Sequence, residues 1–167
     1  IAQCLVGSEM CIRDRANIMW AGMVCHNDMM GVGRKQDWNS HHLEHALSAL
    51  YDCAHGAGLA VIMPAWMRYC ADHHDGLRMA QMAVRVFGCQ MDFADPRRTA
   101  LEGIAAFRAF LKSMGMPLTF AEIGADPADI PKLVEMNHVG DGVTGGYVGL
   151  TSDAIREIYE IAAGLRD

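Results

Sequence analysis

The segment Ser40–Met67, SHHLEHALSALYDCAHGAGLAVIMPAWM, predicts a helix with histidines on one face and leucines on the other. A helix turns about 100° per residue, so His41 and His45 lie about 40° apart, and Ser48 and Asp52 fall within about 20° of one of them. These four side chains form one polar face, called here the histidine stripe. The apolar residues collect on the opposite side: Leu43, Ala46, Leu47, Leu50 and Ala54. We therefore expect the helix to bury its leucines and to present the stripe to a surface or a cleft.

The histidine stripe allows two interpretations. Histidine is the commonest metal ligand and a proton shuttle near neutral pH, yet two histidines four residues apart are also typical of a solvated helix face. His42 points about 100° away from His41, and we interpret it as a surface residue. His55 is expected at the end of the same helix, just before Gly56-Ala57-Gly58. If a new helix starts near Gly56, the positive end of its dipole favours the neutral imidazole, which is the form that binds a metal.

Composition and charge exclude several classes of protein. With 51% hydrophobic and 20% charged residues, the 167-residue chain suits one well-buried globular domain. A net charge of −6 with no basic stripe makes nucleic acid an unexpected partner. The longest apolar run, Leu59–Met67, contains Pro64 and is far shorter than the roughly 20 residues that cross a bilayer, so we expect no membrane span. The six cysteines include no C-x-x-C pair, so we expect reduced thiols in a cytoplasmic protein.

Apolar residues recur at helical spacing along nearly the whole chain, which predicts an all-α helical bundle. Asn39 or Ser40 is expected to cap the histidine helix. The stretch 58–69 is apolar on nearly every side, which predicts a central buried helix, and Pro64 is expected to kink or break it. Asp95-Pro96 is expected to start a later helix.

Three long segments carry a resemblance to a known family. Residues 26–69, HNDMMGVGRKQDWNSHHLEHALSALYDCAHGAGLAVIMPAWMRY, resemble the C-terminal half of the iron-dependent (group III) alcohol dehydrogenases. They are most similar to the branch called NAD(P)H-dependent butanol dehydrogenases. The resemblance continues through FGCQMDFADPRRTALEGIAAFRAFLKSMGMP and GGYVGLTSDAIREIYEIA, and so covers roughly Ala16 to Ala163.

The resemblance implies a fold, a reaction and a site. The fold would be the helical metal-binding domain of these enzymes, which is like the α domain of dehydroquinate synthase. In the family, one aspartate and three histidines hold a divalent metal, usually iron and sometimes zinc. The last two histidines match His41 and His55, and a histidine close to the substrate and nicotinamide matches His45. The full enzyme would transfer hydride between NADH or NADPH and a short-chain aldehyde or alcohol, and it is expected to be a homo-oligomer.

Two departures limit this resemblance. The family's aspartate and first histidine ligands, and its glycine-rich nucleotide-binding loop, lie earlier than any residue of this chain. Gly31-Val32-Gly33 is interpreted as a loop with no phosphate role. We therefore expect residues 16–167 to be the helical metal-binding domain of a longer enzyme, inactive alone, with the nicotinamide bound mainly by the missing N-terminal domain. Residues 1–15 match nothing in the family and are interpreted as a non-native leader, a translated adapter sequence.

Two alternative functions stay open at this point. The domain is compatible with a related metal-dependent enzyme of the glycerol dehydrogenase or dehydroquinate synthase type, although SALYDCAHGAGLAVIMPAWM is closer to the alcohol dehydrogenases. The chain is also compatible with a non-catalytic helical module, an interpretation that would gain support if His41 and His55 pointed away from each other.

Overall fold

The computed structural model describes residues 9–140 and 142–166, and it divides the chain into two compact units, Ile1–Gln36 and Asp37–Asp167. The first unit contains α1 (Glu9–His26) and the short 3-10 helix η2 (Met29–Gly31). The described side chains of α1 are exposed except Val24, which is half-buried. Among its described residues, this unit therefore has no apolar core of its own.

The expected leader overlaps the first unit. Residues 1–8 lie outside the described residues, and residues 9–15 form the first part of α1, which continues without a break to His26. The expected domain boundary at residue 16 thus falls inside a helix, and the assignment of residues 1–15 as a non-native leader stays a prediction.

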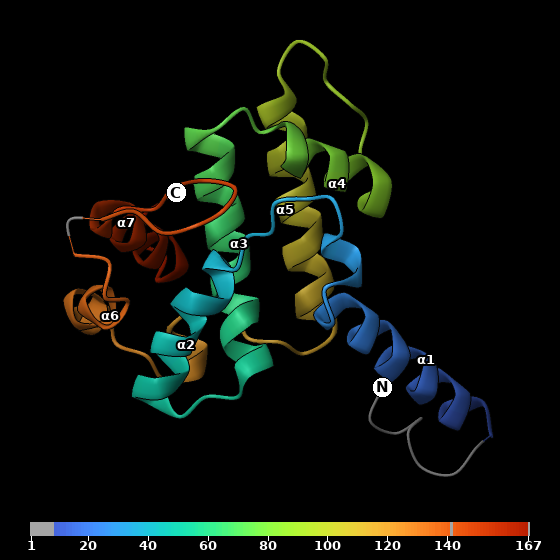
Figure 1. Ribbon diagram of the computed structural model, residues 1–167, viewed down its shortest axis with the longest axis horizontal. Helices are drawn as coiled ribbons and strands as arrows, with labels where there is room; N and C mark the ends of the chain where they lie inside the picture. The colour runs from blue at the N-terminus through green and yellow to red at the C-terminus, as the bar shows by residue number, and fades with distance from the viewer. Residues whose placement is uncertain (1–8, 141, 167) are drawn as a thin grey trace. The chain divides into compact units, whose positions relative to one another are not determined.

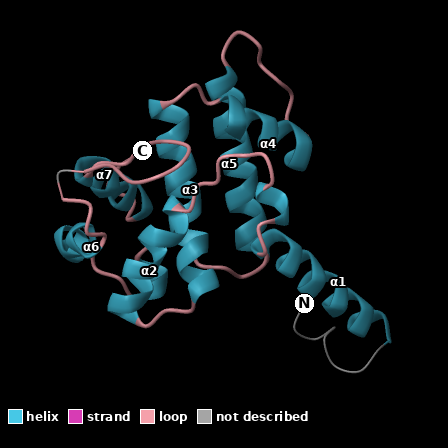
Figure 2. Ribbon diagram, in the orientation of Figure 1, coloured by secondary structure: helices cyan, strands magenta, loops and turns pink. Residues whose placement is uncertain are grey.

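The second unit is a bundle of helices joined by loops (Figure 1). Its helices are α2 (Asn39–Tyr51), α3 (His55–His73), α4 (Leu77–Phe87), α5 (Pro96–Ser113), α6 (Ile130–Met136) and α7 (Ser152–Ala162), with the 3-10 turns η3 (Ala121–Ile123) and η4 (Pro127–Asp129). Figure 2 shows that the described residues form helices joined by loops. In the described ranges, the β pairing consists of a single isolated bridge between Thr144 and Leu150. The expectation of an all-α bundle is confirmed. No helix in the described part of the chain is long and apolar enough to cross a membrane.

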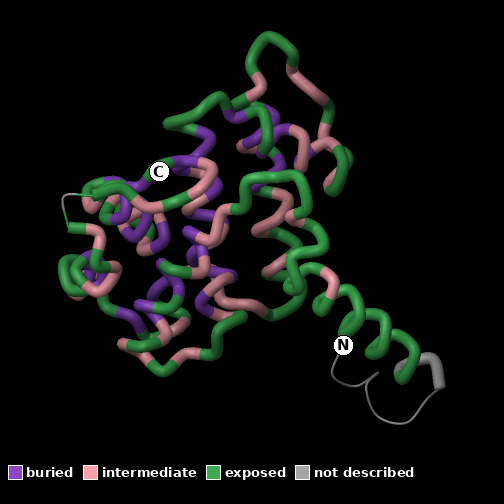
Figure 3. Tube along the Cα trace, viewed as in Figure 1, coloured by how far each residue is buried: buried purple, intermediate pink, exposed green. Residues whose placement is uncertain are grey.

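Helix α3 is the central element of this unit. It packs against α2, α5 and α7, and its apolar residues are buried on several sides, as Figure 3 shows by the purple positions along it. Val61, Ile62 and Cys70 have no exposed surface. The prediction of a central buried helix over residues 58–69 is therefore confirmed.

Of the expected kink or break at Pro64, the break is excluded, because α3 runs continuously from His55 to His73 around it. A proline in a helix interior lacks one backbone N–H and crowds the preceding turn, which costs about 3 kcal/mol or more. Pro64 is itself buried, in a helix that packs against α2, α5 and α7.

The start and the end of α2 differ from the sequence-based expectation. The N-cap is Trp38, and the capping carboxylate belongs to Asp37, whose Oδ1 accepts the backbone N–H of Asn39 at 2.8 Å. The helix ends at Tyr51, because Asp52 adopts a left-handed conformation with φ 50°. His55 therefore begins α3, and the prediction that it ends the histidine helix was wrong.

Candidate metal centre

Asp37 fixes the N-terminal end of α2, where the site begins. Its Oδ2 accepts the backbone N–H groups of Gly146 at 2.9 Å and Tyr147 at 2.7 Å, so one carboxylate joins this end of the helix to the loop that precedes α7. The side chain of Asn39 is 1% exposed and donates to the carbonyl of Val148 at 3.1 Å. These bonds hold the first turn of α2, which carries His41.

The amphipathic pattern of α2 is as predicted for Leu43, Ala46 and Leu47, whereas Leu50 is half-buried, and Ala54 lies beyond the end of α2 and is exposed. Leu43 and Leu47 are buried in the core with 1% and 0% exposure, while His45 is exposed and His41 is partly exposed. The tight turn after Tyr51 then reverses the chain, so that the first residue of α3, His55, faces the histidine stripe.

The imidazole rings of these three histidines gather at one place. The ring centroids of His41 and His55 are 5.3 Å apart, those of His45 and His55 are 5.4 Å apart, and those of His41 and His45 are 6.4 Å apart. The ring of Trp38 lies edge-on to His41 with centroids 4.9 Å apart. The structure thus brings together all three histidines that the sequence analysis singled out.

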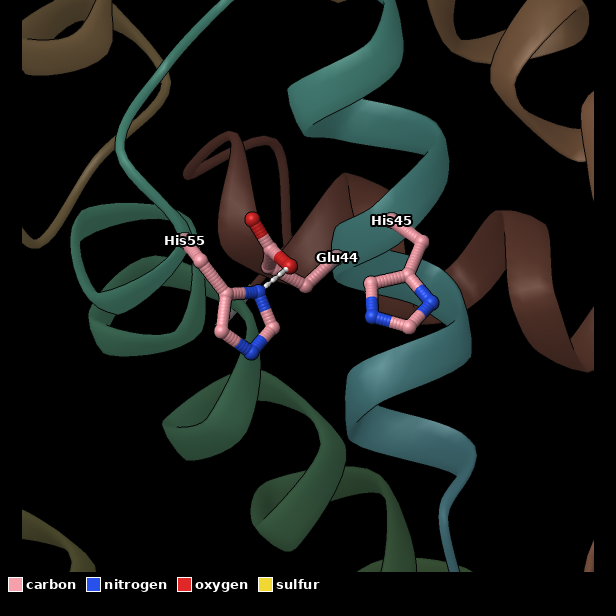
Figure 4. Close-up of side chains that lie close together, drawn as sticks. All are labelled: Glu44, His45 and His55. Carbon is pink, nitrogen blue, oxygen red and sulfur yellow. Dashed lines mark hydrogen bonds and ion pairs between the residues drawn. The ribbon is translucent and has the colours of Figure 1, made fainter.

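Glu44 belongs to the same cluster, although sequence reasoning did not single it out. Its side chain has 0% exposure, and it pairs with Nδ1 of His55 (Figure 4) and accepts a hydrogen bond from the hydroxyl of Ser48. Ligand atoms of Glu44, His45 and His55 lie within 4.8 Å of one another. His41 stands beside this trio as a fourth side chain.

The other two members of the histidine stripe have different environments. Ser48 is half-buried and its hydroxyl bonds Glu44, not a histidine. Asp52 is exposed, and its backbone N–H caps the end of α2 by donating to the carbonyl of Ser48 at 2.8 Å. Within the stripe, Ser48 therefore supports the cluster through Glu44, whereas Asp52 ends the helix.

The donor set fits a divalent transition metal. Imidazole nitrogen is a ligand that both Fe²⁺ and Zn²⁺ accept, and several imidazoles on neighbouring helix turns are the usual way of supplying it. In the buried layer below the rings, α2 is joined to α7, because the hydroxyl of Tyr159 on α7 donates to the carbonyl of Leu43 on α2 at 2.8 Å. Burial, together with the nearby charge of Glu44, raises the pKa of Tyr159 despite the hydrogen bond from Asn137.

An open pocket of about 290 Å³ adjoins the cluster on the side of His45. It is lined by His42, His45, Ala46 and Ala49 from α2, by Met136 and Asn137 at the end of α6, and by Thr144. His42 is exposed, as expected, and its ring lies 6.4 Å from that of His45, centroid to centroid. Space for a small molecule therefore exists beside the histidine that the resemblance places next to substrate.

Comparison with known proteins identifies the family. A model described as "Fe-containing alcohol dehydrogenase family, C-terminal" matches residues 5–163. The chain belongs to the iron-containing alcohol dehydrogenase family. The resemblance drawn from the sequence is therefore confirmed, together with the fold that it implied, but the match begins at residue 5 and so includes part of the segment 1–15 that was expected to match nothing in the family.

Several members of the iron-containing alcohol dehydrogenase family are similar to this chain. Probable NADH-dependent butanol dehydrogenase 1 of Bacillus subtilis is 33% identical over 146 residues, which are 87% of this chain and 37% of that protein. NADPH-dependent aldehyde reductase YqhD of Escherichia coli is 34% identical over 149 residues, which are 89% of this chain and 38% of that protein. The crystal structure of NADH-dependent butanol dehydrogenase A from Thermotoga maritima superposes with a TM-score of 0.80 and 35% identity, over 89% of this chain and 39% of that one. The chain thus spans less than two fifths of the length of these relatives.

Proposed function

We propose that this chain forms the metal-binding part of an alcohol dehydrogenase or aldehyde reductase that transfers hydride between NADH or NADPH and a short-chain aldehyde or alcohol. The observation that carries the proposal is the convergence of three imidazoles, from α2 and the first turn of α3, beside an open pocket. Relatives named butanol dehydrogenase and aldehyde reductase support the substrate class.

The three histidines divide between two roles. His41 and His55 hold Fe²⁺ or Zn²⁺, an assignment that rests on the family resemblance and on the proximity of the two rings. A bound metal of this kind supplies Lewis-acid polarisation of a carbonyl oxygen. His45 is exposed at the edge of the pocket, where it orients the substrate oxygen and holds or moves its proton. The nicotinamide is bound mainly by residues outside this chain.

A chimera tests the proposal. Residues 16–167 would replace the matching C-terminal part of the Bacillus subtilis butanol dehydrogenase relative, and oxidation of NADH or NADPH would be followed with butyraldehyde after loading with Fe²⁺ or Zn²⁺. We expect metal-dependent reduction of the aldehyde by the chimera and none by the 167-residue chain alone. A chimera that folds and binds metal, yet turns over neither cofactor with short-chain aldehydes, would contradict the proposal.

The role of His45 is tested in the same chimera. His45→Ala should lower turnover by about 10²-fold or more, the usual range for losing a general acid or base, while leaving most of the metal bound. His74→Ala is the matched control, because His74 is an exposed histidine at the far end of α3 and does not line the pocket, and it should change turnover far less.

A further inference from the structure

Glu44 is a buried carboxylate whose position calls for an explanation. Its side chain has 0% exposure, whereas the imidazole that it contacts, His55, is 49% exposed. Burying a charged group costs free energy unless hydrogen bonds and opposite charge compensate it. A Glu in this place is therefore expected to have a specific role.

Two groups satisfy the two carboxylate oxygens of Glu44. Oε1 accepts the hydroxyl of Ser48 and Oε2 pairs with Nδ1 of His55. Gly58, in the second turn of α3, leaves the room for this carboxylate, because a Cβ on Gly58 would lie 2.8 Å from Cγ of Glu44. The carboxylate thus sits against the N-terminal end of α3, where the helix dipole favours a negative charge.

The pairing fixes which nitrogen of His55 is available. A carboxylate oxygen acts as the acceptor in this pair, so we assign the proton to Nδ1 of His55. The neutral ring then has its lone pair on Nε2. Figure 4 shows that this second nitrogen points away from Glu44, while the ring of His45 lies across from it.

We propose that Glu44 is a positioning residue, which holds the Nδ1–H of His55 so that Nε2 is presented to a divalent metal. The inference rests on the proposed role of His55 as a metal ligand. A metal-bound histidine commonly donates its other N–H to a carboxylate, which fixes the ring orientation and raises its basicity as a ligand. Ser48 holds the carboxylate from the other side.

The first test uses the metal-free chain and needs no variant. Long-range ¹⁵N spectra of the histidine side chains, recorded at pH 8 where a free imidazole is neutral, report which ring nitrogen is protonated. We expect His55 to be the Nδ1–H tautomer. His55 found with its proton on Nε2 would overturn the proposal.

Variants of Glu44 provide the second test, with the same spectra and with titration of Zn²⁺ into the chain. Glu44→Met fills the same space without an acceptor, and Glu44→Gln keeps the shape without the charge. In Glu44→Met we expect His55 to lose its preference for the Nδ1–H tautomer. We expect both substitutions to raise the Kd for Zn²⁺ by about 10–100-fold, the usual effect of losing such a partner. Ser48→Ala is the control, which should keep the His55 tautomer because the contact with Nδ1 is untouched.

The outcomes separate this inference from the proposed function. If His55→Ala weakens Zn²⁺ binding but neither Glu44 substitution changes the tautomer or the Kd, only the positioning role is wrong. If His55→Ala leaves Zn²⁺ binding unchanged, the proposed metal site itself fails. A spectrum of the Zn²⁺-loaded chain with the metal on Nδ1 of His55 would overturn the positioning role, because the contact with Glu44 would then be replaced.

Discussion

Asp72, in the last turn of α3, joins two helices through two arginines. Its carboxylate accepts from Arg68 at 2.6 Å within α3 and from Arg97 at 2.7 Å in the first turn of α5. Burial raises the pKa of Asp72, but the two arginine hydrogen bonds and charges outweigh burial and leave this pKa below its usual value. The two arginine pairs of Asp72 therefore stabilise the folded protein fully above the pKa of an unfolded Asp, about 3.9. This stabilisation is lost as pH falls through the lower pKa of Asp72 in the folded state.

Asp72→Asn should consequently destabilise the protein in a pH-dependent way. We expect the free energy of unfolding to fall by up to about 1 kcal/mol at pH 7, as for partly exposed ion pairs, and the difference from wild type to shrink at pH 2.5–3. Urea unfolding at the two pH values measures it. Glu135→Gln, at an exposed carboxyl on α6, is the control and should have little effect. An equal loss for Asp72→Asn at both pH values would show that the ion pairs are not its cause.

The sequence predicts part of the site at the level of single residues. His41 and His45 could be placed on one face because helical periodicity fixes their angle. Glu44 could not be assigned in the same way, because it lies about 60° from His41, at the border between the polar and apolar faces of α2. The spacing of Glu44 and Ser48, four residues apart, was the available signal. Its meaning depended on His55, whose position is set by the turn after Tyr51.

At the scale of single helices, the packing of α4 against α5 depends on one small residue. Gly103 on α5 faces Ala83 on α4, and both are buried. A Cβ on Gly103 would lie 2.8 Å from Cα of Ala83, which is closer than atoms of two side chains can pack. The backbones of α4 and α5 are therefore as close as the absence of a side chain at residue 103 allows.

Gly103→Ala should force these two helices apart. Overpacking of this kind costs about 1–3 kcal/mol, which exceeds the gain of up to about 1 kcal/mol from replacing a helical glycine by alanine. Urea unfolding should therefore show a net loss of stability. Gly56→Ala in α3 is the matched control, because open space surrounds that position, and it should be neutral or slightly stabilising. A stabilised Gly103→Ala protein would show that the two helices have room to relax.

Helix identity was easier to predict than helix ends. Apolar spacing indicated α2, α3 and the start of α5 at Pro96, because periodicity and the Asp95-Pro96 pair are local properties. The end of α2 was missed because the left-handed conformation falls on Asp52, a residue type that enters it less often than glycine does. The sequence left open whether α3 breaks at Pro64, because the continuity of the helix there depends on packing by other helices.

At the scale of the whole molecule, the question is whether the first fifteen residues contribute to the stability of the fold. The described side chains of α1 before residue 16 are exposed, and a terminal segment contributes to stability only where packing holds it. We expect deletion of residues 1–15 to leave the melting temperature unchanged within error, as measured by thermal unfolding monitored by circular dichroism. A fall of several degrees would show that this segment belongs to the fold.

The bound metal of the chimera with the Bacillus subtilis relative tests the central claim most directly. His41→Ala and His55→Ala each remove a proposed ligand, so we predict that metal content, measured by mass spectrometry of the purified protein, falls from stoichiometric to near zero in both. His42→Ala, on the same helix and exposed, should retain its metal. Full metal content after both ligand substitutions would contradict the account, because no metal centre built on α2 and α3 survives the loss of those two imidazoles.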